Sequence, residues 1–133
     1  MKRLITSILA ALLLCSALCF SEAETDLLAR LIEAEAGGEE YDGKLAVGAV
    51  VMNRLEDGRW GESITKVIRA KGQFARPKRK ASEDSIKAAK AVLDGERNLP
   101  SFVLFFQKAK VKRFYGYWFC TIGCHNFYGN RES

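Results

Sequence analysis

The sequence predicts an α+β fold in which helices come first and a small antiparallel sheet follows near the C-terminus. Up to about residue 95, apolar residues recur at three- and four-residue steps, and serine and glycine residues stand where these stretches begin and end. This pattern is typical of short amphipathic helices. After that point, residues 102–106 form a β-prone apolar run, and residues 114–128 are rich in aromatic side chains and glycine. The 133 residues contain no internal repeat or linker, so we expect one folded domain.

A first helix is expected over about residues 26–37, capped by Thr25 or Asp26 and ended by the glycine pair at 37–38. Its apolar face is completed by a carboxylate, and this face comprises Leu28, Leu31, Ile32 and Glu35. The sequence therefore predicts an acidic side chain at the edge of a helix face that packs against the core.

Three more helices are expected, over about residues 42–55, 63–71 and 82–94. In the first of them, Gly48 allows another backbone to approach closely, because it has no side chain. The last is expected to begin at Ser82, because a serine followed by two acidic residues is favourable at a helix N-terminus.

The N-terminal segment has the order of a secretory signal peptide. A basic start is followed by an apolar run to Phe20 and by small residues at 21 and 23. We expect cleavage after Ala23, so that residues 1–23 are the signal and residues 24–133 are a secreted domain with no stable membrane anchor. The alternative is a retained anchor, since an apolar run of about 17 residues is near the lower limit for a membrane span.

The chain carries a formal net charge of +5, which favours an anionic partner, and for a secreted bacterial protein this could be wall polymer or a membrane surface. Nucleic acid is not expected as a partner outside the cell. Outside the cytosol Cys120 and Cys124 can form a disulfide if the chain turns between them, and the alternative is two free thiols. A single histidine, His125, argues against a zinc enzyme, so we expect no metal and no other cofactor.

Glu35 is the first candidate for chemistry. A carboxylate on an apolar face loses solvation and more readily holds a proton, which is what a general acid in glycosidic cleavage requires. The alternative is that Glu35 is solvated at a frayed helix end and has no chemical role. The acidic cluster at residues 39–42 is open to a similar alternative, as a solvated loop or as capping for the second helix.

Aromatic side chains form the second candidate constellation, because sugars present apolar ring faces that stack on aromatic plates and polar edges that accept amide or imidazole partners. The rings are Phe74, Phe114, Tyr115, Tyr117, Trp118, Phe127 and Tyr128, and the polar groups are Asn53, Gln73, His125 and Asn126. The alternative, that most of these rings are core, is expected to hold for more than half of them.

Four motifs together resemble the SleB-type, spore cortex-lytic family of cell wall hydrolases. Residues 34–43 (AEAGGEEYDG) and 46–54 (AVGAVVMNR) are similar to its acidic block and its following helix. Residues 72–74 (GQF) match a G-Q-F element, and residues 121–128 (TIGCHNFY) match its closing I-G-x-H-x-F-Y. Each motif alone is weak, but four in the family order are specific.

The resemblance implies a lysozyme-like fold and an enzyme that cleaves peptidoglycan or spore cortex glycan between N-acetylmuramic acid and N-acetylglucosamine. It implies a single catalytic glutamate, Glu35, and either hydrolase or lytic transglycosylase chemistry. It also implies a set of substrate-binding or bracing residues, namely Glu39, Tyr41, Asn53, Arg54, Gln73, Phe74, His125, Phe127 and Tyr128. The sequence departs from the family pattern at Ala34, Gly37, Glu40 and Cys124 and in a shortened, basic segment at 77–80.

Two other function classes remain open from the sequence. One is a peptidoglycan-binding module that keeps the fold without catalysis. The other is a peptidase or amidase that uses Cys120 or Cys124 with His125, which is disfavoured because neighbours on a strand point to opposite faces. An accessory protein partner is possible in any of these classes.

Overall fold

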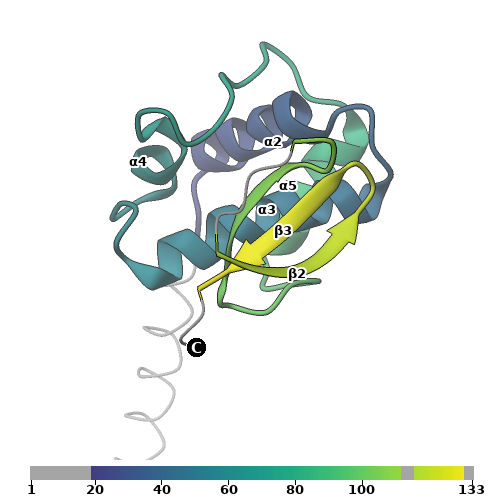
Figure 1. Ribbon diagram of the computed structural model, residues 1–133. Helices are drawn as coiled ribbons and strands as arrows, with labels where there is room; N and C mark the ends of the chain where they lie inside the picture. The colour runs from purple at the N-terminus through teal and green to yellow at the C-terminus, as the bar shows by residue number, and fades with distance from the viewer. Residues whose placement is uncertain (1–18, 112–115, 131–133) are drawn as a thin grey trace, which may run out of the picture.

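The computed structural model describes residues 19–111 and 116–130. Within these residues four helices precede a three-stranded antiparallel sheet, which confirms the α+β prediction (Figure 1). The helices are α2 (Glu22–Ala36), α3 (Tyr41–Asp57), α4 (Ile64–Arg69) and α5 (Glu83–Leu93). The strands are β1 (Val103–Lys108), β2 (Tyr117–Ile122) and β3 (His125–Gly129), in the spatial order β1-β3-β2.

Helix α2 begins four residues earlier than the sequence suggested. Ser21 is the N-cap, and it forms a reciprocal capping box with Glu24, so the expected caps at Thr25 or Asp26 were wrong. Most of the expected signal segment, residues 1–18, lies outside the described residues. Cleavage after Ala23 remains a prediction, and it would remove the Ser21 cap. None of the helices in the described ranges has the length and apolarity that crossing a membrane requires.

The caps of the later helices follow from the sequence. Ser63 and Ser82 accept hydrogen bonds from the backbone amides of Lys66 and Ser85 at the starts of α4 and α5. Helix α3 ends at Gly58, whose φ of 85° is the left-handed conformation that favours glycine. These local signals explain why the helix boundaries are close to those expected.

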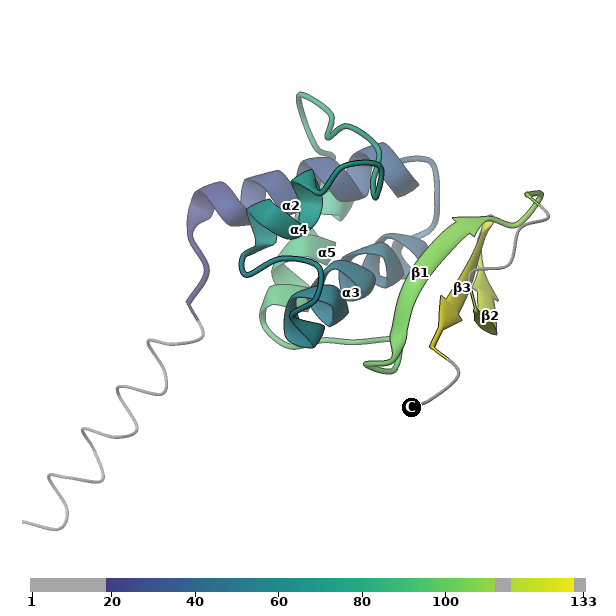
Figure 2. The same cartoon turned by 60° about the vertical axis from the view of Figure 1, so that its left-hand side comes forward.

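Helix α3 is the centre of the molecule, because it contacts the other helices on one side and the sheet on the other (Figure 2). The helical core includes Leu28, Ile32, Val47, Val51 and Val92, and the core under the sheet includes Ala46, Ala49, Val50, Val103 and Phe127. At Gly48 side chains approach closely, not the backbone that the sequence suggested, since a Cβ there would lie 3.0 Å from a methyl group of Val92 and 3.2 Å from one of Ile32. The two cores place the other helices on one side of α3 and the sheet on the other.

Strand β3 is the central strand and pairs antiparallel with both neighbours. Short strands and loops were expected in the aromatic, glycine-rich part of the chain, and the strand found there after β1 is β2, which spans Tyr117–Ile122; residues 112–115 lie outside the described residues. Gly123 and Cys124 form the turn from β2 to β3, with φ of 57° at Gly123. Cys120 and Cys124 are both free thiols in this structure, so of the two alternatives it supports the thiols.

Candidate active site

Glu35 lies in the last turn of α2 and is half-buried. Its Oε1 accepts a hydrogen bond of 2.5 Å from the backbone amide of Ala75. Among the described residues, the hydrogen bonds of this carboxylate engage only Oε1. The second oxygen is therefore free to exchange a proton with a bound molecule.

Arg54 lies close to Glu35 and is held by groups from three segments. Its Nε donates to the carbonyl of Leu104 at 2.7 Å, and its Nη1 donates to Oε1 of Gln73 at 3.2 Å. Its Cζ lies 4.2 Å from the ring centre of Trp60, with two more rings nearby, Phe74 and Phe105. Burial lowers the pKa of Arg54 to about 10, and the charge of Glu35 opposes that shift, so the guanidinium remains charged at neutral pH.

Two surface hollows border the segment that carries Gln73, Phe74 and Ala75. One, of about 580 Å³, is lined by Arg54, Trp60, Gly72, Gln73, Phe105, Phe106, Gln107 and Val111. The other, of about 510 Å³, is strongly basic, with Arg30, Arg69, Lys71 and Arg76 among its lining residues. Among the described residues Glu35 itself lines neither hollow, but Ala75, to which it is bonded, borders the second.

Glu39 contacts the turn between β2 and β3. Its Oε2 lies 2.7 Å from Nδ1 of His125, and its Oε1 accepts a hydrogen bond from the backbone amide of Cys124 at 2.8 Å. The side chains of Glu39 and His125 are only 9% and 3% exposed. Their burial leaves no open face for a sugar, so the expected direct substrate contacts of both residues have no support from the geometry.

The carboxylate of Glu33 is also bound by other groups of the protein. Its Oε2 accepts hydrogen bonds from the hydroxyl of Ser85 at 2.5 Å and from the hydroxyl and amide of Ser82 at 2.8 and 3.1 Å. These bonds, led by the one from Ser85, hold the pKa of Glu33 below its ordinary value against the effect of burial. Glu33 and Glu39 are each held by two residues of the fold, whereas Glu35 accepts a single hydrogen bond among the described residues.

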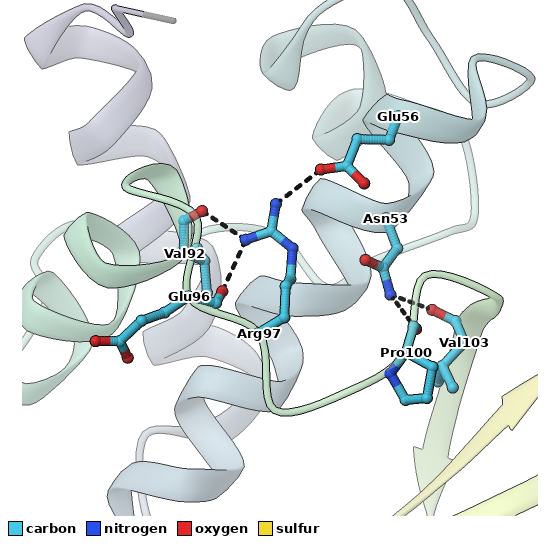
Figure 3. Close-up of polar contacts among 7 residues, drawn as sticks. All are labelled: Asn53, Glu56, Val92, Glu96, Arg97, Pro100 and Val103. Atoms are coloured by element: carbon cyan, nitrogen blue, oxygen red, sulfur yellow. Dashed lines mark hydrogen bonds and ion pairs between the residues drawn. The ribbon is translucent and has the colours of Figure 1, made fainter.

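The side chain of Asn53 binds backbone groups of the protein and does not point to a ligand site (Figure 3). Its buried amide nitrogen donates to the carbonyls of Pro100 and Val103 at 2.8 and 3.0 Å. Nearby, Arg97 joins the end of α3 to the segment after α5 through Glu56 at 2.9 Å (Figure 3). Asn53 and Arg54 together fix the start of β1 against α3, which agrees with the bracing role expected of them.

The remaining candidates divide between surface and core. Gln73 is exposed at the hollow beside Arg54, and Phe74 is half-buried against the guanidinium. Phe127 and Tyr128 are buried, so their expected place in a sugar groove is corrected to the core of the sheet. Tyr41 is half-buried and packs against Lys87 of α5, away from both hollows.

The aromatic constellation is also divided. Tyr117 and Trp118 are 57% and 50% exposed on β2, whereas Phe114 and Tyr115 lie outside the described residues. Trp60 and Phe105 were not expected at the site, although they enclose Arg54. Trp60 follows a glycine in a polar segment. A tryptophan in such a loop was the feature of the sequence that could have indicated its place at the site.

The pair Cys124 and His125 does not have the arrangement of a thiol nucleophile and its base. Their side chains are closer than expected for strand neighbours, with Sγ 3.9 Å from Nδ1, because Cys124 lies in the turn. Glu39 approaches the same ring nitrogen, so the histidine does not relay between acid and thiol. The hydrogen bond of Glu39 raises the pKa of Cys124, which disfavours the reactive thiolate.

Comparison with known proteins identifies the family. The family model described as Cell Wall Hydrolase matches residues 38–128, well over half of the chain. The match begins three residues after Glu35, so it covers the Glu39 and Arg54 regions but not the candidate acid.

Curated relatives match a shorter segment. The spore cortex-lytic enzyme of Bacillus subtilis is 41% identical over 49 residues, and that of Oceanobacillus iheyensis is 37% identical over 49 residues. These segments are 37% of this chain but only 16% and 18% of the two relatives. The chain thus matches less than a fifth of the length of these relatives.

Two solved structures share the fold. The catalytic domain of the Bacillus cereus SleB protein has a TM-score of 0.75 at 22% identity, over 82% of this chain and 91% of that one. The catalytic domain of the germination-specific lytic transglycosylase SleB from Bacillus anthracis has a TM-score of 0.73 at 21% identity, over 81% of this chain and 95% of that one. The lobe of helices and the small sheet are therefore a SleB catalytic-domain fold.

Proposed function

Because this chain belongs to the Cell Wall Hydrolase family, we propose that it cleaves the glycan strand of peptidoglycan, with Glu35 as its only catalytic carboxylate. One observation carries the choice of Glu35. Glu33 is held by Ser82 and Ser85, and Glu39 by Cys124 and His125, whereas Glu35 accepts a single hydrogen bond among the described residues. Glycan cleavage also agrees with the relatives' name, spore cortex-lytic enzyme.

In the proposed reaction, protonated Glu35 donates its proton to the glycosidic oxygen as the bond to the muramic acid carbon C1 breaks. The ionised carboxylate then takes a proton from the hydroxyl that attacks C1. That hydroxyl belongs either to the same sugar, which leaves an anhydro end, or to water, which leaves a reducing end. The internal attack needs no second enzymic base or nucleophile, so one catalytic carboxylate is sufficient for it.

Arg54 is proposed as a positioning residue. Its charged guanidinium lies near Glu35 and interacts with it electrostatically. Its guanidinium also fixes Gln73 beside the hollow of about 580 Å³, where a sugar can lie against Trp60 and Phe105. The positively charged hollow on the other side of the same segment suits the carboxylates of the wall's peptide stems. An extracytoplasmic location, spore cortex or vegetative wall, belongs to the same proposal.

The experiment is to compare lysis of purified peptidoglycan by the wild type, Glu35→Gln and Glu40→Gln. Loss of the acid should lower the rate at least about a hundredfold, since general acid–base catalysis contributes that much or more. Glu40→Gln is the matched control, because Glu40 is exposed and makes no side-chain cap bond. Retained lysis in Glu35→Gln contradicts the proposal, and peptidoglycan binding without lysis in the wild type favours a binding module.

A further inference from the structure

The turn between β2 and β3 meets the connection between α2 and α3 at three side chains of different chemistry. A carboxylate oxygen of Glu39, the thiol of Cys124 and a ring nitrogen of His125 all lie within 4.8 Å of one another. We propose that these three residues bind one thiophilic divalent cation, for which Zn²⁺ is the best fit. The inference does not depend on the proposed glycan cleavage.

The distances between the three groups are close to those of a zinc site. In a tetrahedral site with ligand bonds of about 2.1–2.3 Å, neighbouring ligand atoms are about 3.4–3.7 Å apart. Sγ of Cys124 is 3.9 Å from Nδ1 of His125, and Oε2 of Glu39 is 2.7 Å from that nitrogen. Binding would therefore require the carboxylate oxygen to move away from the ring by less than about 1 Å.

One buried oxygen of Glu39 has a single neighbouring polar group. Its Oε2 has no assigned hydrogen bond from a described group, and its close contact is Nδ1 of His125 at 2.7 Å, although the side chain is only 9% exposed. Buried polar atoms usually have well-defined hydrogen-bond partners. A cation between Oε2, the ring and the thiol would give this oxygen, the ring nitrogen and the thiol a common partner.

The other oxygen of Glu39 is already held in place. Oε1 accepts the amide of Cys124 at 2.8 Å, and this type of support orients a carboxylate ligand. Gly123 leaves room for it, because a Cβ there would lie within clashing distance of Oε1. The turn and the carboxylate therefore fit each other before any cation binds.

The set of donors favours zinc over magnesium or calcium. Thiolate and imidazole ligands suit Zn²⁺, whereas Mg²⁺ and Ca²⁺ prefer oxygen ligands only. On binding, the Cys124 thiol would lose its proton to solvent, and neutral His125 would bind through Nδ1. Because Cys124 is exposed, water can complete the fourth position. A lone histidine argued against zinc in the sequence, but the fold adds a distant carboxylate and an adjacent thiol.

The test is a Zn²⁺ titration of the purified, reduced chain against a chromogenic chelator, with Cys124→Ser and Cys120→Ser as the variants. We expect one Zn²⁺ per chain in the wild type and in Cys120→Ser, whose thiol lies outside the cluster. The affinity of Cys124→Ser should fall at least about tenfold. Co²⁺ in place of Zn²⁺ should give thiolate-to-metal charge-transfer absorption in the wild type and in Cys120→Ser only.

Two further measurements keep the result interpretable. Circular dichroism checks that Cys124→Ser folds, which its exposed position predicts. Glu39→Gln should also weaken Zn²⁺ binding, because it removes the second ligand. The proposal is overturned if the wild type binds no stoichiometric Zn²⁺, if Cys124→Ser binds it equally well, or if Co²⁺ shows no thiolate band. None of these outcomes depends on lysis of peptidoglycan.

Discussion

Glu35 accepts a hydrogen bond from the backbone amide of Ala75, forty residues further along the chain. The bond fixes the last turn of α2 against the segment that carries Gln73, and Gln73 in turn binds Arg54. Glu35 and Arg54 are thereby both connected to the segment with Gln73 that borders the hollow.

Arg54→Lys should lower both stability and lysis. Lysine keeps the charge but lacks the planar fork that binds Leu104 and Gln73 at the same time, so the free energy of unfolding should fall by about 2 kcal/mol. Urea unfolding and peptidoglycan lysis measure the two effects. Arg59→Lys is the control, because Arg59 is exposed and pairs only locally with Asp57. Equal stability of the two variants would show that the buried fork is unimportant.

Gly48→Val should destabilise the helical core by about 1–3 kcal/mol, the usual cost of overpacking. A Cβ at this position already lies 3.0 Å from Val92 and 3.2 Å from Ile32, and valine adds two methyl groups. Thermal unfolding checks the expectation. Gly38→Ala is the matched control, since nothing lies within 4 Å of a Cβ there. A Gly48→Val variant as stable as Gly38→Ala would mean that α3 and α5 can separate at little cost.

Much of the fold could be predicted from the sequence because its signals are local. Ser82 indicates the start of a helix and the glycine pair at 37–38 indicates the end of one, whatever the rest of the fold. Gly48 indicates a place where a neighbouring helix packs closely. The start of α2 was missed because Ser21 was assigned to the signal segment and not considered as a cap. The limits of the C-terminal strands were less accurate, because a run of aromatic residues indicates a strand but does not show which residues pair with the neighbouring strand.

Glu33→Gln should change how stability depends on pH. The folded pKa of Glu33 is depressed, chiefly by the Ser85 hydroxyl, so its contribution is present above the unfolded pKa near 4.5 and is lost as pH falls through the lower folded pKa. Partial exposure limits the effect to about 1 kcal/mol. Between about pH 5 and 3, the wild type should therefore lose more stability than Glu33→Gln. Parallel melting-temperature curves for the two proteins would contradict this account.

Gly123→Ala should destabilise the protein more than Gly72→Ala. Both glycines have positive φ, 57° and 73°, so alanine costs about 1–2 kcal/mol of backbone strain at either position. Only at Gly123 does the new methyl group also meet the Glu39 carboxylate. Chemical unfolding of both variants measures the difference. Equal losses would mean that Glu39 moves aside freely.

The candidate site was less predictable than the fold, because its partners are distant in sequence. No local pattern indicates that Glu39 meets Cys124, 85 residues away, or that a backbone amide at Ala75 binds Glu35. The motif residues Asn53, Phe127 and Tyr128 were expected in a sugar groove but are buried. A short motif indicates that its residues belong to one site, but it does not distinguish a residue that supports the site from one that contacts the substrate.

The central claim, that this chain cuts the glycan strand through Glu35, is tested most directly by mass spectrometry of muropeptides released from purified peptidoglycan. The wild type should release fragments cut after N-acetylmuramic acid, with anhydro ends if the sugar's own hydroxyl attacks and reducing ends if water does. Glu35→Gln should release neither, although it keeps the fold. Intact glycan strands with the wild type, or identical fragments from both proteins, would contradict the account.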